Sequence, residues 1–170
     1  MASKGHNPAL RPFLPQDAAL CAAIAEASIT ELTAEDYTEA QQEAWIAAVA
    51  DEDSLRQKLA GQLTLIASLG GAPVGFVSLK GNDRLDMIYV HPGAAGQGVG
   101  SALCDAVEKL AGARGTARLT VDASDTAQSF FAKRGYVAQQ RNTLPLGDEW
   151  LGNTTMTKEL ATGQAGKATQ

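Results

Sequence analysis

The sequence is poor in the residues that build disulfides and metal sites. Its 170 residues include only two cysteines and two histidines. Cys21 and Cys104 lie far apart and lack the C-x-x-C spacing of zinc and redox motifs, and His6 and His91 do not complete a ligand cluster. We therefore expect no metal site, and we expect both cysteines to be small hydrophobic residues of the core.

Long apolar runs and an excess of positive charge are also absent. The most apolar stretches, such as residues 63–69, are much shorter than the ~20 residues that cross a bilayer. With 14 basic and 19 acidic residues the net charge is -5, which gives no general attraction to nucleic acid or to an anionic membrane. The amino terminus does not have the pattern of a secretory signal. These absences predict a cytoplasmic protein without nucleic-acid or membrane partners.

The apolar residues that are present suffice for one core. Hydrophobic residues make up 45% of the chain, and neither a repeat nor a Pro/Gly-rich linker divides it. Residues 1–8 and 161–170 are polar and rich in small side chains. We therefore expect a flexible amino terminus (1–8), a single domain (9–160) and a polar carboxy-terminal tail (161–170).

The spacing of apolar residues changes along the chain from helical to strand-like and back. The expected helices cover residues 17–29, with Asp17 as N-cap, 34–50, 53–60, 99–110 and 126–133. The expected strands cover residues 63–69, 74–79, 85–90, 118–122, 136–140 and 154–160. Glycine-rich turns separate the first three strands, which predicts an antiparallel meander followed by one parallel crossover. The fold class is therefore mixed α+β.

The glycine-dense segment Gly96-Gln97-Gly98-Val99-Gly100 lies between an expected strand and the first turn of a helix. The first N–H groups of a helix have no partner within it, and glycine allows a ligand to approach this backbone closely. The helix dipole adds partial positive charge. The segment therefore predicts a pyrophosphate site, and the simpler alternative is a tight turn between two elements.

Two other phosphate-binding loops fit this segment less well. A Walker A loop needs Gly-Lys-Ser/Thr, but Ser101 follows Gly100 directly. The dinucleotide fingerprint G-x-G-x-x-G needs a third glycine where Ser101 stands, although Asp122 ends the next strand at a suitable distance. That fingerprint also belongs to a parallel sheet, which disagrees with the predicted meander.

Two motifs resemble those of the GCN5-related N-acetyltransferase (GNAT) superfamily. Val90-His91-Pro92 through Gly100 resembles V-x-P…Q/R-x-x-G-x-G/A, with Ala95 where the family usually has Gln or Arg. Residues 127–136 resemble A-x-x-F-Y-x-K-x-G-F, with Phe131 at the tyrosine position. The resemblance implies a central, mostly antiparallel sheet of about six to seven strands flanked by helices.

The resemblance also implies acetyl-CoA as cosubstrate and an amine of a small molecule or peptide as acceptor. The pyrophosphate would bind the loop, the pantetheine arm would follow the end of the third meander strand, and Ser124 would take the family's usual Asn position. The implied cofactor-binding residues are Ile88, Tyr89, Val90, Ala95, Gly96, Gln97, Gly98, Val99, Gly100, Ser101, Ser124, Phe131 and Lys133. A homodimer is a further expectation by analogy.

In such an enzyme the amine attacks the thioester directly, and main-chain amides near Tyr89 and Val90 would polarise its carbonyl. Phe131 cannot donate a proton as the family's tyrosine does. For the base, the candidates in order of preference are Asp86, His91, Glu31 and Tyr37. Asp86 comes first because it lies on the strand that would line the cleft, and His91 follows because an imidazole titrates near neutrality.

The departures at Ala95 and Phe131 leave a second function open. A module that binds acyl-CoA for regulation and does not turn it over would tolerate both changes. A dinucleotide-binding protein is the third alternative.

Overall fold

The computed structural model describes residues 7–161. Residues 1–6 and 162–170, which make up most of the two predicted terminal segments, lie outside the described residues. The helices are α1 (Ala18–Leu32), α2 (Glu39–Val49), α3 (Glu52–Ala60), α4 (Val99–Ala113) and α5 (Gln128–Lys133), with 3-10 turns η2 (Pro15–Asp17) and η3 (Pro92–Ala94). The strands are β1 (Ala9–Pro12), β2 (Leu63–Leu69), β3 (Ala72–Lys80), β4 (Arg84–Val90), β5 (Arg118–Ser124), β6 (Val137–Leu146) and β7 (Glu149–Glu159).

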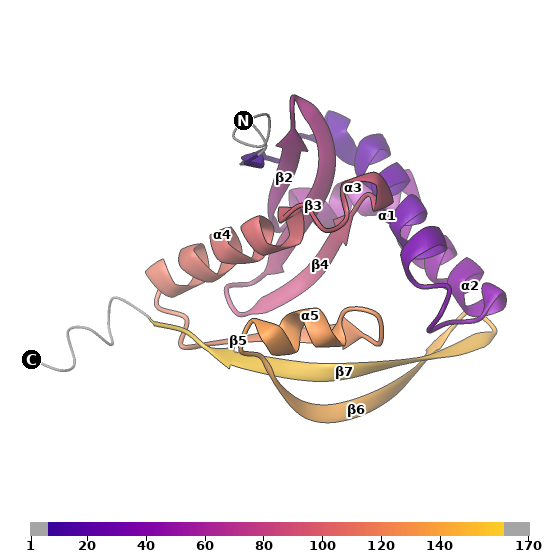
Figure 1. Ribbon diagram of the computed structural model, residues 1–170. Coiled ribbons are helices and arrows are strands. Elements are labelled where there is room, and N and C mark those ends of the chain that lie inside the picture. The colour runs from indigo at the N-terminus through magenta and orange to yellow at the C-terminus, as the bar shows by residue number, and fades with distance from the viewer. Residues whose placement is uncertain (1–6, 162–170) are drawn as a thin grey trace, which may run out of the picture.

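The seven strands form one sheet in the order β1-β2-β3-β4-β5-β7-β6 (Figure 1). Every neighbouring pair is antiparallel except β4 and β5, which α4 connects. The predicted α+β class, the meander and the single parallel crossover are therefore confirmed. A dinucleotide fold needs a mainly parallel sheet, so the third functional alternative is excluded.

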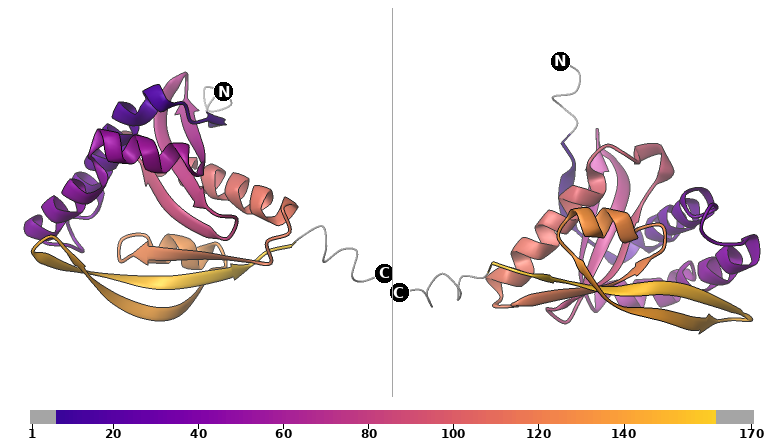
Figure 2. Two further views of the ribbon diagram at one scale, coloured as in Figure 1. Left: turned by 180° about the vertical axis from the view of Figure 1, so that it is seen from behind. Right: turned by 60° about the horizontal axis from the view of Figure 1, so that its bottom comes forward.

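Helices cover both faces of the sheet and divide the core into two clusters. On one face α4 buries residues spaced three or four apart, namely Val99, Leu103, Cys104, Val107 and Ala111. On the other face α1 and α3 lie against the sheet (Figure 2). There they pack against Phe76 and Met87. Cys21 and Cys104 are both fully buried, one in each cluster, as predicted for core residues. No helix within residues 7–161 is long and apolar enough to cross a membrane.

A β-bulge in β4 changes the face of the sheet on which the side chains before and after it lie. Ser78 of β3 pairs with Met87 and Leu79 pairs with Leu85, so Asp86 is the extra residue of the bulge. Residues two apart in a regular strand share a face. Because of the bulge, Leu85 joins the α4 cluster whereas Met87 joins the α1 cluster.

The parallel pair β4–β5 holds together only at its beginning. Arg84 pairs with Thr120 and Leu85 with Val121, and no later pair follows. Beyond this point the strands diverge, so the edge of β4 from residue 86 to residue 90 has no strand partner toward β5. The sheet thus opens at its centre, next to the start of α4.

Some element boundaries differ from the predictions. The four-residue strand β1 was not predicted, because it is short and ends at Pro12. The last two strands are longer than expected and form a hairpin that turns at Gly147, whose φ is 57°. The residues of β6 are mostly exposed, and both strands contain many polar residues, so neither shows a clear alternation of apolar and polar residues in the sequence. The expected helix over 34–50 begins only at Glu39, where Thr38 accepts a hydrogen bond from the Gln41 amide.

The prediction that Asp17 caps the first helix is wrong. Its side chain makes no capping hydrogen bond to α1. Instead Arg11 donates two hydrogen bonds to the carboxylate, at 2.8 and 2.9 Å, and the Leu14 amide donates a third at 2.7 Å. The Arg11 guanidinium, despite the opposing effect of burial, lowers the pKa of Asp17. Asp17 therefore ties β1 to the start of α1.

Candidate functional site

The glycine-rich loop folds back on itself before α4. Gly96 and Gly98 have φ values of 78° and 83°, in the left-handed region that other residues rarely adopt. A Cβ on either glycine would meet no atom within 4 Å. Glycine is therefore needed at these two positions for the backbone conformation and not for lack of space.

This backbone presents a row of main-chain donors. The N–H groups of Gly96 through Ser101 find no acceptor among residues 7–161, whereas the flanking Ala95 amide donates to Pro92 O at 3.1 Å and the Ala102 amide donates to Gly98 O at 3.0 Å. The Gln97 side chain donates to Gly93 O at 3.2 Å and holds the loop. Six consecutive unpaired donors at a helix start fit a pyrophosphate, and exceed what a simple turn requires.

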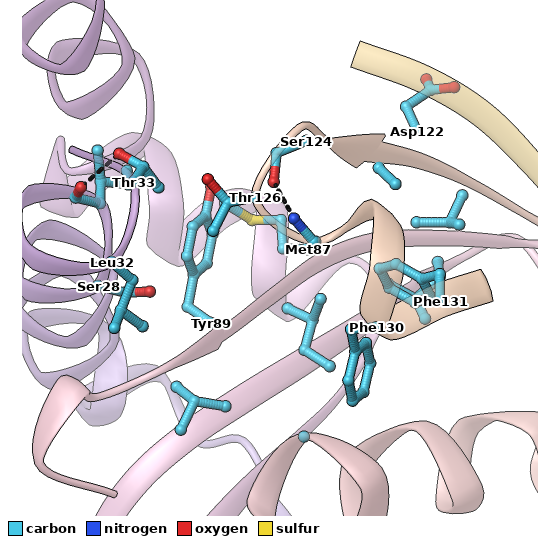
Figure 3. A pocket seen from close by; sticks show the side chains of 18 of the residues that line it. Ser28, Leu32, Thr33, Met87, Tyr89, Asp122, Ser124, Thr126, Phe130 and Phe131 are labelled. Atoms are coloured by element: carbon cyan, nitrogen blue, oxygen red, sulfur yellow. Dashed lines mark hydrogen bonds between the residues drawn. The ribbon is translucent and has the colours of Figure 1, made fainter. Parts of the chain in front are cut away.

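A cavity of about 270 Å³ occupies the gap between the diverging strands (Figure 3). Its walls come from the edge of β4, from β5, from α5 and from the end of α1, and Gly100 of α4 lies at one end. Most of the lining is apolar. The cavity therefore runs from the glycine-rich loop to the helices on the opposite face of the sheet.

Phe130 and Phe131 have different surroundings in this cavity. Phe131 is 1% exposed, and its ring packs edge-on between those of Phe130 and Tyr136, with centroids 5.2 and 5.1 Å away. Phe130 is only partly buried and lies over Gly100. Phe130 thus belongs to both the core and the cavity wall.

The chain is similar to known acetyltransferases over most of its length. The family model "Acetyltransferase (GNAT) domain" matches residues 33–160. The chain belongs to the GNAT family. It is 31% identical over 151 residues to the uncharacterized N-acetyltransferase YafP of Escherichia coli, which covers 89% of this chain and 95% of that protein.

Solved structures agree with this assignment. A GCN5-related N-acetyltransferase from Rhodopseudomonas palustris is 65% identical, covers 91% of this chain and 96% of its own, and superposes with a TM-score of 0.89. PaiA N-acetyltransferase from Thermoplasma acidophilum, solved in complex with coenzyme A, shares the fold at 19% identity, with coverages of 90% and 99% and a TM-score of 0.75. Membership of the family confirms the predicted N-acetyltransferase class and acetyl-CoA as cosubstrate.

Asp86 and His91 lie at opposite ends of the exposed edge of β4. Asp86 lines the cavity, and its Oδ2 accepts a hydrogen bond from Gln62 Nε2 at 3.0 Å, with Lys58 Nζ 4.0 Å away. His91 is exposed and does not line the cavity; its Nδ1 accepts a hydrogen bond from the Gly93 amide at 3.0 Å. The structure therefore brings only Asp86 to the cavity.

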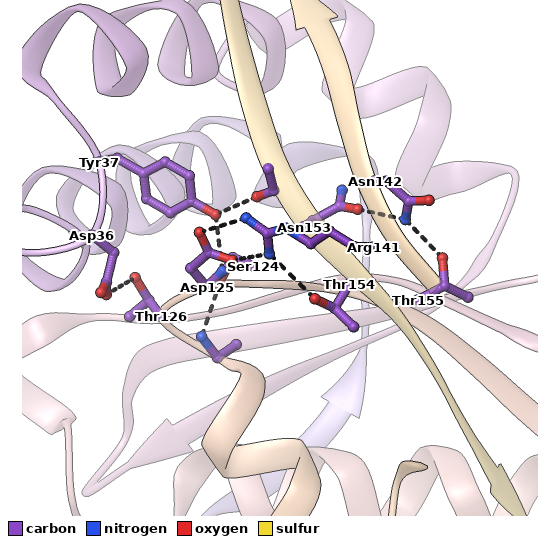
Figure 4. Close-up of polar contacts among 12 residues, drawn as sticks. Asp36, Tyr37, Ser124, Asp125, Thr126, Arg141, Asn142, Asn153, Thr154 and Thr155 are labelled. Carbon is purple, nitrogen blue, oxygen red and sulfur yellow. Dashed lines mark hydrogen bonds and ion pairs between the residues drawn. The ribbon is translucent and has the colours of Figure 1, made fainter. Parts of the chain in front are cut away.

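Glu31 and Tyr37 are also separated from the cavity. Glu31 is exposed on α1 and does not contribute to the lining. The Tyr37 hydroxyl donates to Gly152 O at 2.7 Å and accepts from the Asp125 amide at 2.9 Å, so both of its hydrogen-bonding roles are filled (Figure 4). Tyr37 fastens the loop after α1 to β7 and to the turn after β5.

The remaining predicted cofactor residues lie around the loop and the end of β5. Ser124 lines the cavity, and its Oγ accepts a hydrogen bond from the Ala127 amide at 3.1 Å, which shapes the turn into α5. Lys133 is exposed at the end of α5. Its neighbour Arg134 is held by ion pairs with Asp105 and Glu108 at 2.6 and 3.2 Å.

The end of the cavity away from the glycine-rich loop contains a contact that the sequence did not indicate. Trp45 of α2 lines the cavity and donates a hydrogen bond from Nε1 to the Tyr89 hydroxyl at 2.9 Å. Burial raises the pKa of Tyr89 to about 12. The hydroxyl is therefore neutral near pH 7. No spacing in the sequence relates residue 45 to residue 89.

A network of hydrogen bonds and ion pairs lies beside the end of the cavity that Trp45 and Tyr89 line. Arg141 of β6 forms a bidentate ion pair with Asp125 and also donates to Thr154 Oγ1 at 3.3 Å (Figure 4). Thr126 donates to Asp36 Oδ2 at 2.7 Å. Together with Tyr37, these contacts connect the loop between α1 and α2 to the β6–β7 hairpin.

Proposed function

We propose that this acetyltransferase moves the acetyl group from acetyl-CoA to a primary amine of a small molecule or peptide, by direct attack within a ternary complex. One observation carries the proposal: a single cavity extends from Gly100, whose amide belongs to the donor row of the glycine-rich loop, through the gap between β4 and β5 to the end of α1. The two substrates would enter this channel from opposite faces of the sheet. Such an arrangement places both reactants together without a covalent enzyme intermediate.

In this proposal the main chain binds most of the cosubstrate. The amides of Gly96 through Ser101 would hold the pyrophosphate, and the exposed Lys133 would lie toward the phosphates of the nucleotide end. Ala95 lacks the long side chain common in the family, so the amides carry this recognition. The unpaired edge of β4 from Ile88 to Val90 would bind the pantetheine arm and stabilise negative charge on the thioester oxygen.

Asp86 is the best supported of the predicted bases. It lines the cavity, and the hydrogen bond from Gln62 fixes one carboxylate oxygen while the other has no donor within residues 7–161. A base must reach the amine directly or through one water. Because Phe131 offers no proton, the CoA thiolate would leave unprotonated or take a proton from solvent.

Ligand-dependent stability tests the donor site. Acetyl-CoA at a hundred times its dissociation constant should stabilise the folded protein by about 2.7 kcal/mol, whereas NAD and ATP should not.

A panel of amines assayed for CoA release tests catalysis. Binding of acetyl-CoA without CoA release for any amine would favour the regulatory module instead.

The Asp86→Asn variant tests the base, with Gln62→Ala as a matched variant that removes the supporting hydrogen bond. We expect Asp86→Asn to lower kcat by about 10²-fold or more and to leave the KM for acetyl-CoA unchanged. Unchanged turnover would remove Asp86 from this role.

A cytoplasmic location and a homodimer stay predictions.

A further inference from the structure

We propose that the acceptor is a small amine with a hydrogen-bond-accepting oxygen, such as a carbonyl, close to its amino group, and that the Tyr89 hydroxyl recognises this oxygen. This inference deepens the proposed function and rests on it. The observations that carry it are the hydrogen bonds of the hydroxyl, the aromatic wall around it and the pairing of nearby charges.

The Tyr89 hydroxyl has one hydrogen-bonding role filled and one open. Its oxygen accepts the indole N–H of Trp45 at 2.9 Å, so the hydroxyl hydrogen must point elsewhere. Within residues 7–161 it has no acceptor. Since Tyr89 lines the cavity and is only partly buried, a bound acceptor is in a position to provide one. An oxygen atom on the bound acceptor molecule would then accept a hydrogen bond from the Tyr89 hydroxyl.

The raised pKa of Tyr89 agrees with this role, because a neutral phenol remains a donor at physiological pH. A group that must give up its proton would need the opposite shift. Tyr89 keeps its proton in this proposal and serves in recognition, whereas Asp86 serves as the base.

Aromatic rings surround this donor and hold it in place. The Tyr37 and Trp45 rings meet edge-on at 5.3 Å, Trp45 and Tyr89 are 6.5 Å apart, and Tyr89 lies 5.7 Å from Phe76. Tyr37 is itself fixed by hydrogen bonds to β7 and to the turn after β5. The donor direction is thus preorganised, beside a surface that suits an apolar or aromatic group on the acceptor.

The charges of the lining argue against a polycationic acceptor. Among the described residues the cavity wall includes two carboxylates, Asp86 and Asp122, and no Lys or Arg. Each carboxylate already has a cation nearby: Lys58 Nζ lies 4.0 Å from Asp86, and Arg84 Nη1 lies 3.0 Å from Asp122. Thr155 Oγ1 also donates to Asp122 at 2.6 Å. The negative charge of each carboxylate is therefore partly balanced by a cation of the protein itself, which weakens its attraction for a polycationic acceptor.

Three acceptors test the proposal by CoA release: L-phenylalaninamide, 2-phenylethylamine, which lacks the carboxamide, and spermidine. The full-length protein should use phenylalaninamide with the highest kcat/KM, by about tenfold over 2-phenylethylamine, as one neutral hydrogen bond allows. In the Tyr89→Phe variant, which keeps the main-chain groups of β4, the kcat/KM for phenylalaninamide should fall about tenfold further than that for 2-phenylethylamine.

The Trp45→Phe variant keeps the hydroxyl but removes the N–H that orients it, so we expect a smaller, about threefold loss for phenylalaninamide. The Trp150→Phe variant, an exposed aromatic outside the cavity, serves as its control. Thermal unfolding of each variant identifies any general loss of structure. If Tyr89→Phe lowered kcat/KM equally for both aromatic amines, the side chain would have a structural role and the inference would be overturned.

A preference for spermidine, or for 2-phenylethylamine over phenylalaninamide, would also overturn it, while leaving the acetyltransferase function intact. Failure of acetyl-CoA to bind would instead overturn the proposed donor site. Binding of acetyl-CoA without turnover of any of the three amines would contradict the acceptor class stated here.

Discussion

The Phe130 ring lies against Gly100 so closely that a Cβ on Gly100 would be 3.3 Å from Phe130 Cζ. Gly100 is the last glycine of the loop and lies in the first turn of α4. The Arg134 guanidinium, held by Asp105 and Glu108, lies over the Phe130 ring with its Cζ 5.9 Å from the ring centroid. The loop and the cavity wall are therefore coupled by direct contact.

Substituting Gly100 by Ala should push Phe130 toward the cavity. Overpacking of this kind costs ~1 kcal/mol or more, so the KM for acetyl-CoA should rise about fivefold. The higher helix propensity of Ala, worth about 1 kcal/mol, should keep the free energy of unfolding nearly constant. Adding Phe130→Leu should restore the affinity in the double variant. Affinity that is the same in Gly100→Ala and the unmodified protein would contradict the coupling.

Gly98 provides a test of the loop conformation. Gly98→Ala should destabilise the fold by ~1 kcal/mol, because Ala rarely adopts a φ of 83°, and should weaken acetyl-CoA binding at least tenfold. Gly71→Ala is the matched control: its φ is 84°, it too has free space around the Cβ, and it lies in the turn between β2 and β3. We expect a similar loss of stability and no change in binding. Titration of acetyl-CoA and urea unfolding measure the two effects.

Glu108 should be important for stability. It is largely buried, accepts a hydrogen bond from the Tyr136 hydroxyl at 2.9 Å, and pairs with Lys158 at 2.8 Å and Arg134 at 3.2 Å. Glu108→Ala leaves these groups without their shared partner and should cost about 3 kcal/mol in urea unfolding.

The comparison is Glu159→Ala, which removes the exposed pair with Arg118. That change should cost less than about 1 kcal/mol. Similar losses in the two variants would show that the buried cluster has no special role.

Stability should fall in alkaline solution. Burial raises the pKa of the Cys21 and Cys104 thiols from 9.0 to about 12, so between these values the native state holds protons that the unfolded state has released. The free energy of unfolding then decreases as pH rises, by up to ~1.4 kcal/mol per pH unit for each thiol. Urea unfolding from pH 8 to pH 11 measures this slope. The Cys21→Ala/Cys104→Ala double variant should show a shallower slope, and an identical one would disprove the role of the thiols.

The sequence by itself determined the local features of this protein. The periodicity of α4, the meander of β2, β3 and β4, and the glycine-rich loop could be predicted, because a helix period, a turn and a positive φ depend on neighbouring residues. The full lengths of β6 and β7 were not predicted, because their many polar residues show little alternation with apolar ones.

Only the tertiary structure decided which distant residues form the site. The bulge at Asp86 turns Tyr89 toward α2, where Trp45 meets it, and the divergence of β4 from β5 opens the cavity. Phe130 reaches Gly100 because α5 packs over the start of α4. Such contacts follow from strand register and from packing between elements, which residue spacing along the chain does not specify.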